Sequence, residues 1–228
     1  VQTCALPICK ESLCCLTTFL FDMDGTLFDT EKYYNRAWKQ AISDSGYELP
    51  EEEVLKLRSL GRPFALEQFQ RWFGPEVDYL AIREHRKELM KDFLSGQIPL
   101  KPAVPETLRF LKAQGYRLAV VTATGPEQAE HNLCTAGIRQ YFDAVICATM
   151  VERGKPAPDV YAYACHTLGV TPEECYAVED SPNGVRSAHD AGCRVIMIPD
   201  LTQPDKATGK LLHRKLDTFG ALRNMPVE

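Results

Sequence analysis

Asp22-Met23-Asp24-Gly25-Thr26 directly follows an apolar run at residues 16–21, and this junction is the most informative part of the chain. The run predicts a buried strand over residues 16–22. Side chains two positions apart at the end of a strand point to the same side, so we expect the Asp22 and Asp24 carboxylates to lie together. Gly25 lets the backbone turn sharply beneath them. Such a pair can hold a divalent cation and attack or protonate a bound group, which suits phosphoryl transfer through an aspartyl nucleophile.

From residue 101 onward the sequence repeats a pattern of helix, glycine and strand. Helices are predicted at residues 105–114, 127–136, 159–168 and 182–191, and strands at residues 117–122, 144–148, 175–179 and 194–198. A glycine follows each helix, which is the usual signal that ends one. Strands that alternate with helices predict a doubly wound α/β core with a parallel sheet and right-handed crossovers. After Asp200 the pattern is weak, and we expect a short strand near Leu216 and a final helix.

Residues 30–100 contain apolar stripes at helical spacing. The stripes are Tyr34, Ala37, Trp38 and Ala41, then Ala65, Phe69, Trp72 and Phe73, then Tyr79, Ile82, Met90 and Phe93. This spacing predicts amphipathic helices throughout. The simplest account is an all-helical cap inserted after the first strand, over the catalytic face. The predicted domains are an α/β catalytic core of residues 16–29 and 101–228, and a helical cap of residues 30–100.

Residues 1–15 are expected to be a leader that is non-native or disordered. The first eight residues resemble the in-frame translation of a common sequencing adapter, so we keep them out of the fold prediction. Residues 10–21 mimic a signal peptide, but the apolar stretch runs into Asp22 without a cleavage site. No segment approaches the ~20 apolar residues that a membrane span requires.

Composition is that of a globular protein with a sizeable core. The chain has 228 residues, 45% apolar and 25% charged, with a net charge of −5. Without a basic stripe, neither nucleic acid nor a membrane surface is an expected partner. The nine cysteines show no metal-site spacing. Buried free thiols in a reducing cytoplasm are therefore expected for Cys134, Cys147, Cys165, Cys175 and Cys193. We expect a monomer or weak homodimer.

Polar residues follow several predicted strands at the edge where a doubly wound sheet binds its ligands. They are Asp22, Asp24, Thr122, Thr124, Lys155, Glu179 and Asp180. Phosphate monoesters hydrolyse very slowly without a catalyst, so the charge on the transferring group must be stabilised extensively. Lys155 can neutralise that group, and the Thr122 hydroxyl can donate to its oxygens. Asp22 and Asp180 can hold Mg²⁺, a hard ion that takes few protein ligands.

Four ordered motifs resemble those of the haloacid dehalogenase superfamily of phosphatases and phosphomutases. Between residues 19 and 199 they are D-M-D-G-T, Thr122 after V-V, G-K-P-A-P-D, and V-E-D-S-P-N-G-V. By this resemblance, Asp22 is the nucleophile that becomes aspartyl-phosphate and a ligand of Mg²⁺. Asp24 is the general acid and base, with its backbone carbonyl on the metal.

The same resemblance implies roles for the remaining polar residues. Thr122 and Lys155 hold the phosphoryl group, and Thr124 is a further substrate-binding candidate. Asp180 completes the metal site, and Glu179 supports it or ligates through water.

The insertion also resembles the cap of β-phosphoglucomutase-like members. The similar segments are Y-Y-N-R-A-W-K at residues 33–39 and Gly61-Arg62. This likeness implies that Arg62 reaches the non-transferred end of the substrate, and that the cap opens and closes to exclude water. The basic residues Arg83, Arg86 and Lys87 are interpreted as an exposed helix face.

The sequence therefore predicts a Mg²⁺-dependent phosphatase acting on a small phosphorylated metabolite, with a sugar phosphate as the expected substrate. The first alternative is a β-phosphoglucomutase-type isomerase. Two departures disfavour it: Tyr34 replaces a cap histidine of those mutases, and Gly125-Pro126 replaces their Lys-Asn. Asp24 disfavours a dehalogenase, which has an aromatic residue there, and the cap offers no good lysine for phosphonate hydrolysis. A non-catalytic magnesium- or phosphate-binding module is the alternative from another class.

Overall fold

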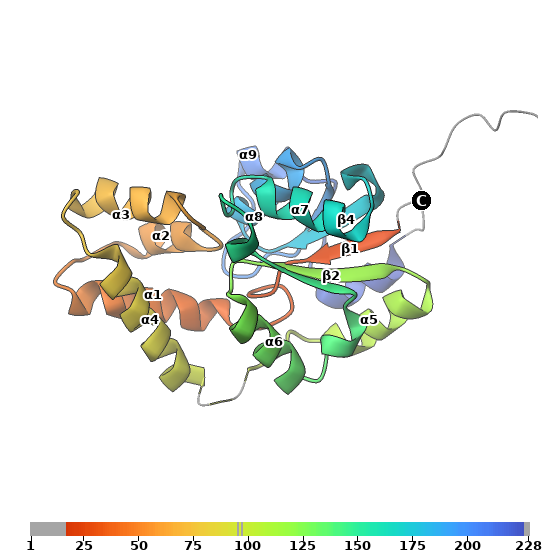
Figure 1. Cartoon of the computed structure of the whole chain (residues 1–228), viewed down its shortest axis with the longest axis horizontal. Helices are drawn as coiled ribbons and strands as arrows, with labels where there is room; N and C mark the ends of the chain where they lie inside the picture. The colour runs from red at the N-terminus through yellow and green to blue at the C-terminus, as the bar shows by residue number, and fades with distance from the viewer. Residues whose placement is uncertain (1–16, 95, 97, 226–228) are drawn as a thin grey trace, which may run out of the picture.

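The computed structural model describes residues 17–94, 96 and 98–225. The predicted leader, residues 1–15, lies outside the described residues. A six-stranded parallel sheet forms the centre of the molecule, in the order β3-β2-β1-β4-β5-β6 (Figure 1). The strands are β1 (Thr18–Phe21), β2 (Arg117–Thr122), β3 (Ala144–Cys147), β4 (Cys175–Glu179), β5 (Arg194–Met197) and β6 (Arg214–Lys215). The doubly wound α/β fold is confirmed.

Strand β1 lies at the switch point of this sheet. It pairs with β2 on one side and β4 on the other, so that Phe21 lies between Val120 and Val178. The order of strands reverses at β1, and ligands of such sheets bind at the carboxyl end of that position. The residues that follow Phe21 therefore begin the candidate site.

Helices cover both faces of the sheet. They are α5 (Val104–Ala113), α6 (Pro126–Thr135), α7 (Asp159–Leu168), α8 (Pro182–Asp190) and α9 (Lys206–Gly209). Alternate β1 side chains enter the two cores: Phe19 and Phe21 pack with α5 and α6, whereas Leu20 packs with α7 and α8. Figure 1 shows α5 and α6 on one side and α7 and α8 on the other.

The chain between β1 and α5 is helical in the structure. It holds α1 (Glu31–Asp44), α2 (Glu51–Val54), the 3₁₀ helix η1 (Leu55–Leu57), α3 (Phe64–Phe73) and α4 (Tyr79–Leu94). These helices share a separate core, in which Ala41, Phe69 and Ile82 are buried, and they form a layer beside the sheet (Figure 1). The inserted helical cap is confirmed, while the exact domain boundaries stay predictions. Among the described residues, no helix has the length and apolarity of a membrane span.

Smaller elements differ from the prediction in instructive ways. The expected short strand is β6, and the expected final helix is the 3₁₀ helix η5 (Phe219–Asn224). Further 3₁₀ turns are η2 (Arg139–Tyr141), η3 (Ala148–Met150) and η4 (Pro172–Glu174). Helix α9 was not predicted, because four residues are too short for a periodic stripe. The prediction that all five central cysteines are buried is wrong for Cys134, which is exposed on α6.

Candidate active site

The turn after β1 brings two carboxylates to the carboxyl end of the sheet. Asp22 is 2% exposed, and its backbone N–H donates to Val178 O at 2.9 Å, which continues the pairing with β4. Gly25 has a φ of +90°, and a Cβ there would overlap the Asp180 carboxylate. A glycine is therefore required both for the backbone angle and for the close approach of Asp180.

Lys155 is fully buried beside Asp22. Its ammonium donates to Asp22 Oδ1 at 2.6 Å, to Glu179 Oε1 at 2.6 Å and to Val121 O at 3.0 Å, which uses all three N–H groups. Burial lowers the pKa of Lys155, but the charges of Asp22 and Glu179 outweigh it and raise this pKa overall. The lysine is thus held as a cation among carboxylates.

Asp22, Glu179 and Asp180 form a buried carboxylate cluster with ligand atoms within 4.8 Å of one another. Burial raises the pKa of Asp22 well above its usual value, against the pull of Lys155. Burial likewise raises the pKa of Asp180 to about 6. Asp22 Oδ2 and Asp180 Oδ1 are buried and accept no hydrogen bond from any residue that the structure describes. Two orphaned carboxylate oxygens fit a hard divalent cation such as Mg²⁺.

Asp24 is held from both sides by hydroxyl groups. Thr30 donates to its Oδ1 at 2.7 Å, and Thr124 donates to its Oδ2 at 2.9 Å. Burial raises the pKa of Asp24, although these two hydrogen bonds oppose the shift. Thr122 is buried at the end of β2, where its hydroxyl accepts the N–H of Thr124 at 3.0 Å. Thr30 and Thr124 therefore hold the Asp24 carboxylate directly, and Thr122 holds the backbone of Thr124.

Glu179 has a second buried partner that the sequence did not indicate. The Tyr161 hydroxyl donates to Glu179 Oε1 at 2.7 Å, and Tyr161 is itself fully buried in α7. A Cβ at Gly184 would overlap the Glu179 carboxylate, so α8 begins directly against it. Ser181 caps α8 by accepting the Gly184 N–H at 3.1 Å.

A cap residue, Arg58, also reaches this cluster and was missed in the sequence. Its guanidinium donates to Asp180 Oδ2 and, at 3.0 Å, to Asp180 O. It also pairs with Glu31 at 3.3 Å. Arg58 and Glu31 are 5% and 4% exposed, so these charges lie in the interior. Nothing in the local sequence marks Arg58, because its partners are far away along the chain.

The predicted cap residue Arg62 is exposed, unlike the buried site residues of the core. Its side chain is exposed, while its backbone carbonyl accepts the Gly154 N–H at 2.7 Å. Next to it, the Gly61 N–H donates to Lys155 O at 2.8 Å. The structure thus brings the Arg62 backbone to the loop that carries Lys155, and a role for its guanidinium stays a prediction.

The prediction of an exposed basic face on α4 is wrong for Arg86. Its guanidinium lies 5.2 Å from the ring centre of Tyr34 and 4.9 Å from that of Trp38, and its Nε is buried without a hydrogen bond to the described residues. Its charge lowers the pKa of Asp24, although burial has the larger, opposite effect. Arg86 therefore faces the site from the cap.

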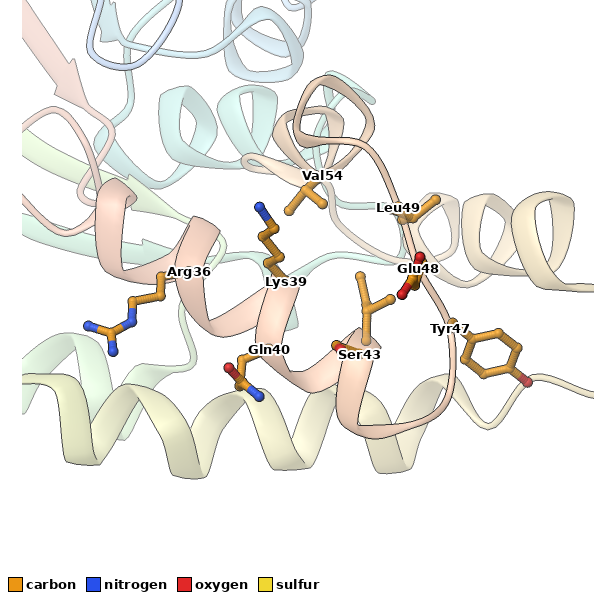
Figure 2. Close-up of a pocket in the computed structure, with 9 residues that line it drawn as sticks. Arg36, Lys39, Gln40, Ser43, Tyr47, Glu48, Leu49 and Val54 are labelled. Atoms are coloured by element: carbon orange, nitrogen blue, oxygen red, sulfur yellow. The ribbon is translucent and has the colours of Figure 1, made fainter.

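A cavity of about 430 Å³ lies elsewhere, within the cap (Figure 2). Arg36, Lys39 and Gln40 of α1 line one side, and the segment from Tyr47 to Val54 lines the other. Figure 2 shows Lys39 pointing away from Arg36 and Gln40. None of the predicted site residues lines this cavity. It lacks the convergent polar groups of a binding site.

A doubly wound sheet with a helical cap and carboxylates at its switch point defines a class of capped α/β enzymes. A model of the haloacid dehalogenase-like hydrolase family matches residues 19–198. CbbY of Cereibacter sphaeroides is 33% identical over 219 residues, covering 91% of this chain and 94% of that protein. A phosphorylated carbohydrates phosphatase of Thermotoga maritima is 30% identical over 177 residues, covering 76% of this chain and 80% of that protein.

A solved structure with a similar fold points to the same family. The "Putative beta-phosphoglucomutase" of Bacteroides vulgatus has a TM-score of 0.78 at 25% identity, covering 92% of this chain and 86% of its own. The chain belongs to the haloacid dehalogenase-like hydrolases, in the β-phosphoglucomutase-like subgroup. It is therefore a hydrolase.

Proposed function

We propose that this hydrolase is a Mg²⁺-dependent phosphatase that cleaves a small phosphorylated metabolite, a sugar phosphate, through an aspartyl-phosphate on Asp22. The observation that carries the proposal is the buried cluster of Asp22, Glu179 and Asp180 with Lys155 against two of its members. Family membership supports the reaction class. The phosphorylated carbohydrates phosphatase among the relatives supports the substrate class.

The orphaned oxygens Asp22 Oδ2 and Asp180 Oδ1 are the natural ligands for the metal. The backbone carbonyl of Asp24 would add a third oxygen, and Glu179 would support the site or ligate through water. Bound Mg²⁺ supplies positive charge that stabilises the phosphoryl oxygens. Protein side chains carry out the bond-making and proton-transfer steps.

In the first half-reaction, a carboxylate oxygen of Asp22 attacks phosphorus, and the bond from phosphorus to the ester oxygen breaks. Lys155 neutralises charge on the transferring group, and Thr122 donates a hydrogen bond to it. Protonated Asp24 gives its proton to the departing alkoxide. The raised pKa of Asp24 and its two threonine partners suit this role.

In the second half-reaction, water attacks the aspartyl-phosphate. The Asp24 carboxylate takes a proton from that water, the bond from phosphorus to Asp22 breaks, and inorganic phosphate leaves. Asp22 is then a free carboxylate and Asp24 is protonated again. The sum is one ester and one water converted to one alcohol and one phosphate.

The cap supplies the groups for the rest of the substrate. Arg86 has a buried Nε without an acceptor among the described residues and lies close enough to Asp24 to affect its pKa, so it can bind the hydroxyl-rich or anionic end. Arg62 is the second cap candidate. Free thiols at the five described cysteines support action in a reducing cytoplasm, and we propose a monomer or weak homodimer there.

The test is phosphate release from a panel of sugar phosphates and p-nitrophenyl phosphate, with and without Mg²⁺. We expect Mg²⁺-dependent release by the parent, none by Asp22→Asn, and strongly reduced release by Asp24→Asn. Absence of Mg²⁺-dependent release would favour the non-catalytic binding module. Interconversion of glucose 1- and 6-phosphates without net release would favour the mutase instead.

A further inference from the structure

The cap segment between α2 and α3 lies directly against the metal-binding end of the core. Asn183 Nδ2 donates to Lys56 O at 3.1 Å and to Arg58 O at 2.8 Å. Farther along, backbone hydrogen bonds join Gly61 to Lys155 and Gly154 to Arg62. The segment is thus bound to the first turn of α8, just after Asp180, and to the loop that carries Lys155.

Arg58 extends this contact into the carboxylate cluster. One guanidinium nitrogen, Nη2, donates both to Asp180 Oδ2 and to Asp180 O, so it fixes the side chain and backbone of one residue together. The other, Nη1, donates to Thr202 Oγ1 at 2.8 Å. The Nε lies 3.3 Å from Glu31 Oε2. A buried arginine held by Asp180 and Thr202 of the core and by Glu31 of the cap has little freedom to move away from Asp180.

The two oxygens of the Asp180 carboxylate have different surroundings. Oδ2 is bonded to Arg58, whereas Oδ1 is buried and accepts no hydrogen bond from the described part of the chain. A cation can therefore bind Oδ1 while Arg58 keeps Oδ2. Groups that bond the second oxygen of a ligand carboxylate commonly fix its orientation toward the metal.

We propose that Arg58 is a positioning residue of the metal site: it holds Asp180 so that Oδ1 faces the cation, which makes cation affinity depend on the docked cap segment. The inference rests on the proposed function, because it assumes that Asp180 is a metal ligand. It goes beyond that function by assigning part of the metal site to the cap. Arg58 is not itself among the proposed metal ligands.

Charge alone predicts the opposite sign, which makes the proposal sharply testable. Removal of a cation from beside Asp180 and Glu31 leaves the cluster more negative, and a more negative cluster attracts a divalent cation more strongly. A positioning role predicts weaker cation binding after the same substitution. The direction of the change in affinity therefore decides between the two.

The experiment measures Mn²⁺ binding to the full, metal-stripped chain, with free Mn²⁺ followed by electron paramagnetic resonance. We expect Arg58→Gln to weaken binding about 10–100-fold, the range for lost outer partners of metal ligands. Arg58→Lys should recover part of the loss, because it keeps the positive charge and one donor nitrogen. Arg71→Gln, on an exposed arginine of the cap helix α3, is the matched control and should bind Mn²⁺ as the parent does.

Thr202→Val provides a second variant in case Arg58→Gln does not fold. Thr202 bonds Arg58 but is not among the proposed metal ligands, and its loss should weaken Mn²⁺ binding by a smaller factor. Unchanged or tighter binding by folded Arg58→Gln, or by Thr202→Val when Arg58→Gln is unfolded, overturns the positioning role. Asp180→Asn separates the two proposals: if the parent does not bind Mn²⁺, or Asp180→Asn binds it equally well, the proposed metal site itself is wrong.

Discussion

Lys155 is the main compensating charge for Asp22 and Glu179. We expect Lys155→Met to abolish phosphatase activity and to lower the free energy of unfolding by about 3–5 kcal/mol, because it leaves two buried carboxylates without their partner. Urea unfolding measures the loss of stability. Lys112→Met is the control, since Lys112 pairs with Asp143 at a partly exposed position and should cost less than about 1 kcal/mol. Equal losses for the two variants would contradict the central charge role of Lys155.

Asp24 has a different expected signature, namely loss of rate without loss of fold. Asp24→Asn should lower kcat about 10²–10⁴-fold, the usual contribution of a general acid. Its thermal unfolding should change little, because Thr30 and Thr124 keep a polar partner. Steady-state kinetics at saturating Mg²⁺ measures the effect, with Asp29→Asn, at a half-exposed carboxylate paired to lysines, as control. A kcat within twofold of the parent would remove Asp24 from the mechanism.

Individual site residues were predictable where a strand end fixes their place. Asp22, Asp24, Lys155 and Asp180 each lie beside a motif at the carboxyl edge of the sheet, so topology alone brings them together. Arg58 and Tyr161 were not predictable in this way. Arg58 meets Asp180 across 122 positions, and Tyr161 belongs to an apolar helix stripe that predicts a core residue. Their place beside the carboxylate cluster is revealed only by side-chain contacts.

The segment between α2 and α3 meets the loop before α7 through two glycines. A Cβ on Gly61 would lie 2.7 Å from the Gly154 Cα, and the backbone angle of Gly61 is one that other residues adopt. Gly61→Ala should therefore act through overlap alone, at a cost of about 1–3 kcal/mol to docking of the segment. We expect kcat/KM to fall about 5–150-fold, which is the same energy expressed as a ratio.

Gly209→Ala is the matched control for this variant. Gly209 also has an ordinary backbone angle, and a Cβ there meets nothing within 4 Å. The control should keep the parental kcat/KM. If Gly61→Ala also keeps it, close docking of this segment is not needed for turnover.

At the level of elements, the sequence prediction was accurate where a glycine or a polar residue marks the end of the element. The helix at Asp159–Leu168 and the strands at Arg117–Thr122 and Cys175–Glu179 agree with their predicted bounds, because a glycine or a polar strand end marks each limit. Helix α9 depends on a local cap instead, in which Asp205 accepts the Thr208 N–H at 2.7 Å. Such a cap closes a single turn without any hydrophobic pattern.

In the molecule as a whole, buried and exposed carboxyl groups affect stability in opposite directions. Burial raises the pKa of Asp22, Asp24, Glu31 and Asp180. A raised pKa in the folded state means that protonation favours folding, so the stability these groups contribute at low pH is lost as pH rises through that pKa. Exposed pairs have the reverse effect: a hydrogen bond from His85 lowers the pKa of Asp44, and one from Asn35 lowers that of Glu51. The contributions of the two sets to the free energy of unfolding therefore partly cancel when stability is measured as a function of pH.

The Mg²⁺-induced rise in Tm isolates the buried set, because exposed pairs contribute equally with and without metal. Mg²⁺ binds the charged carboxylates, and with the pKa of Asp180 at about 6 this ligand is mostly protonated at pH 5 and charged at pH 7.5. We expect the difference in Tm between Mg²⁺ and EDTA to be small at pH 5 and clear at pH 7.5. At pH 7.5, Mg²⁺ at about 100 times its Kd should raise the free energy of unfolding by about 2.7 kcal/mol. Differential scanning calorimetry at both pH values measures it, and Asp180→Asn should remove most of the difference. A Mg²⁺ effect of equal size at pH 5 would show that the metal does not bind through these buried carboxylates.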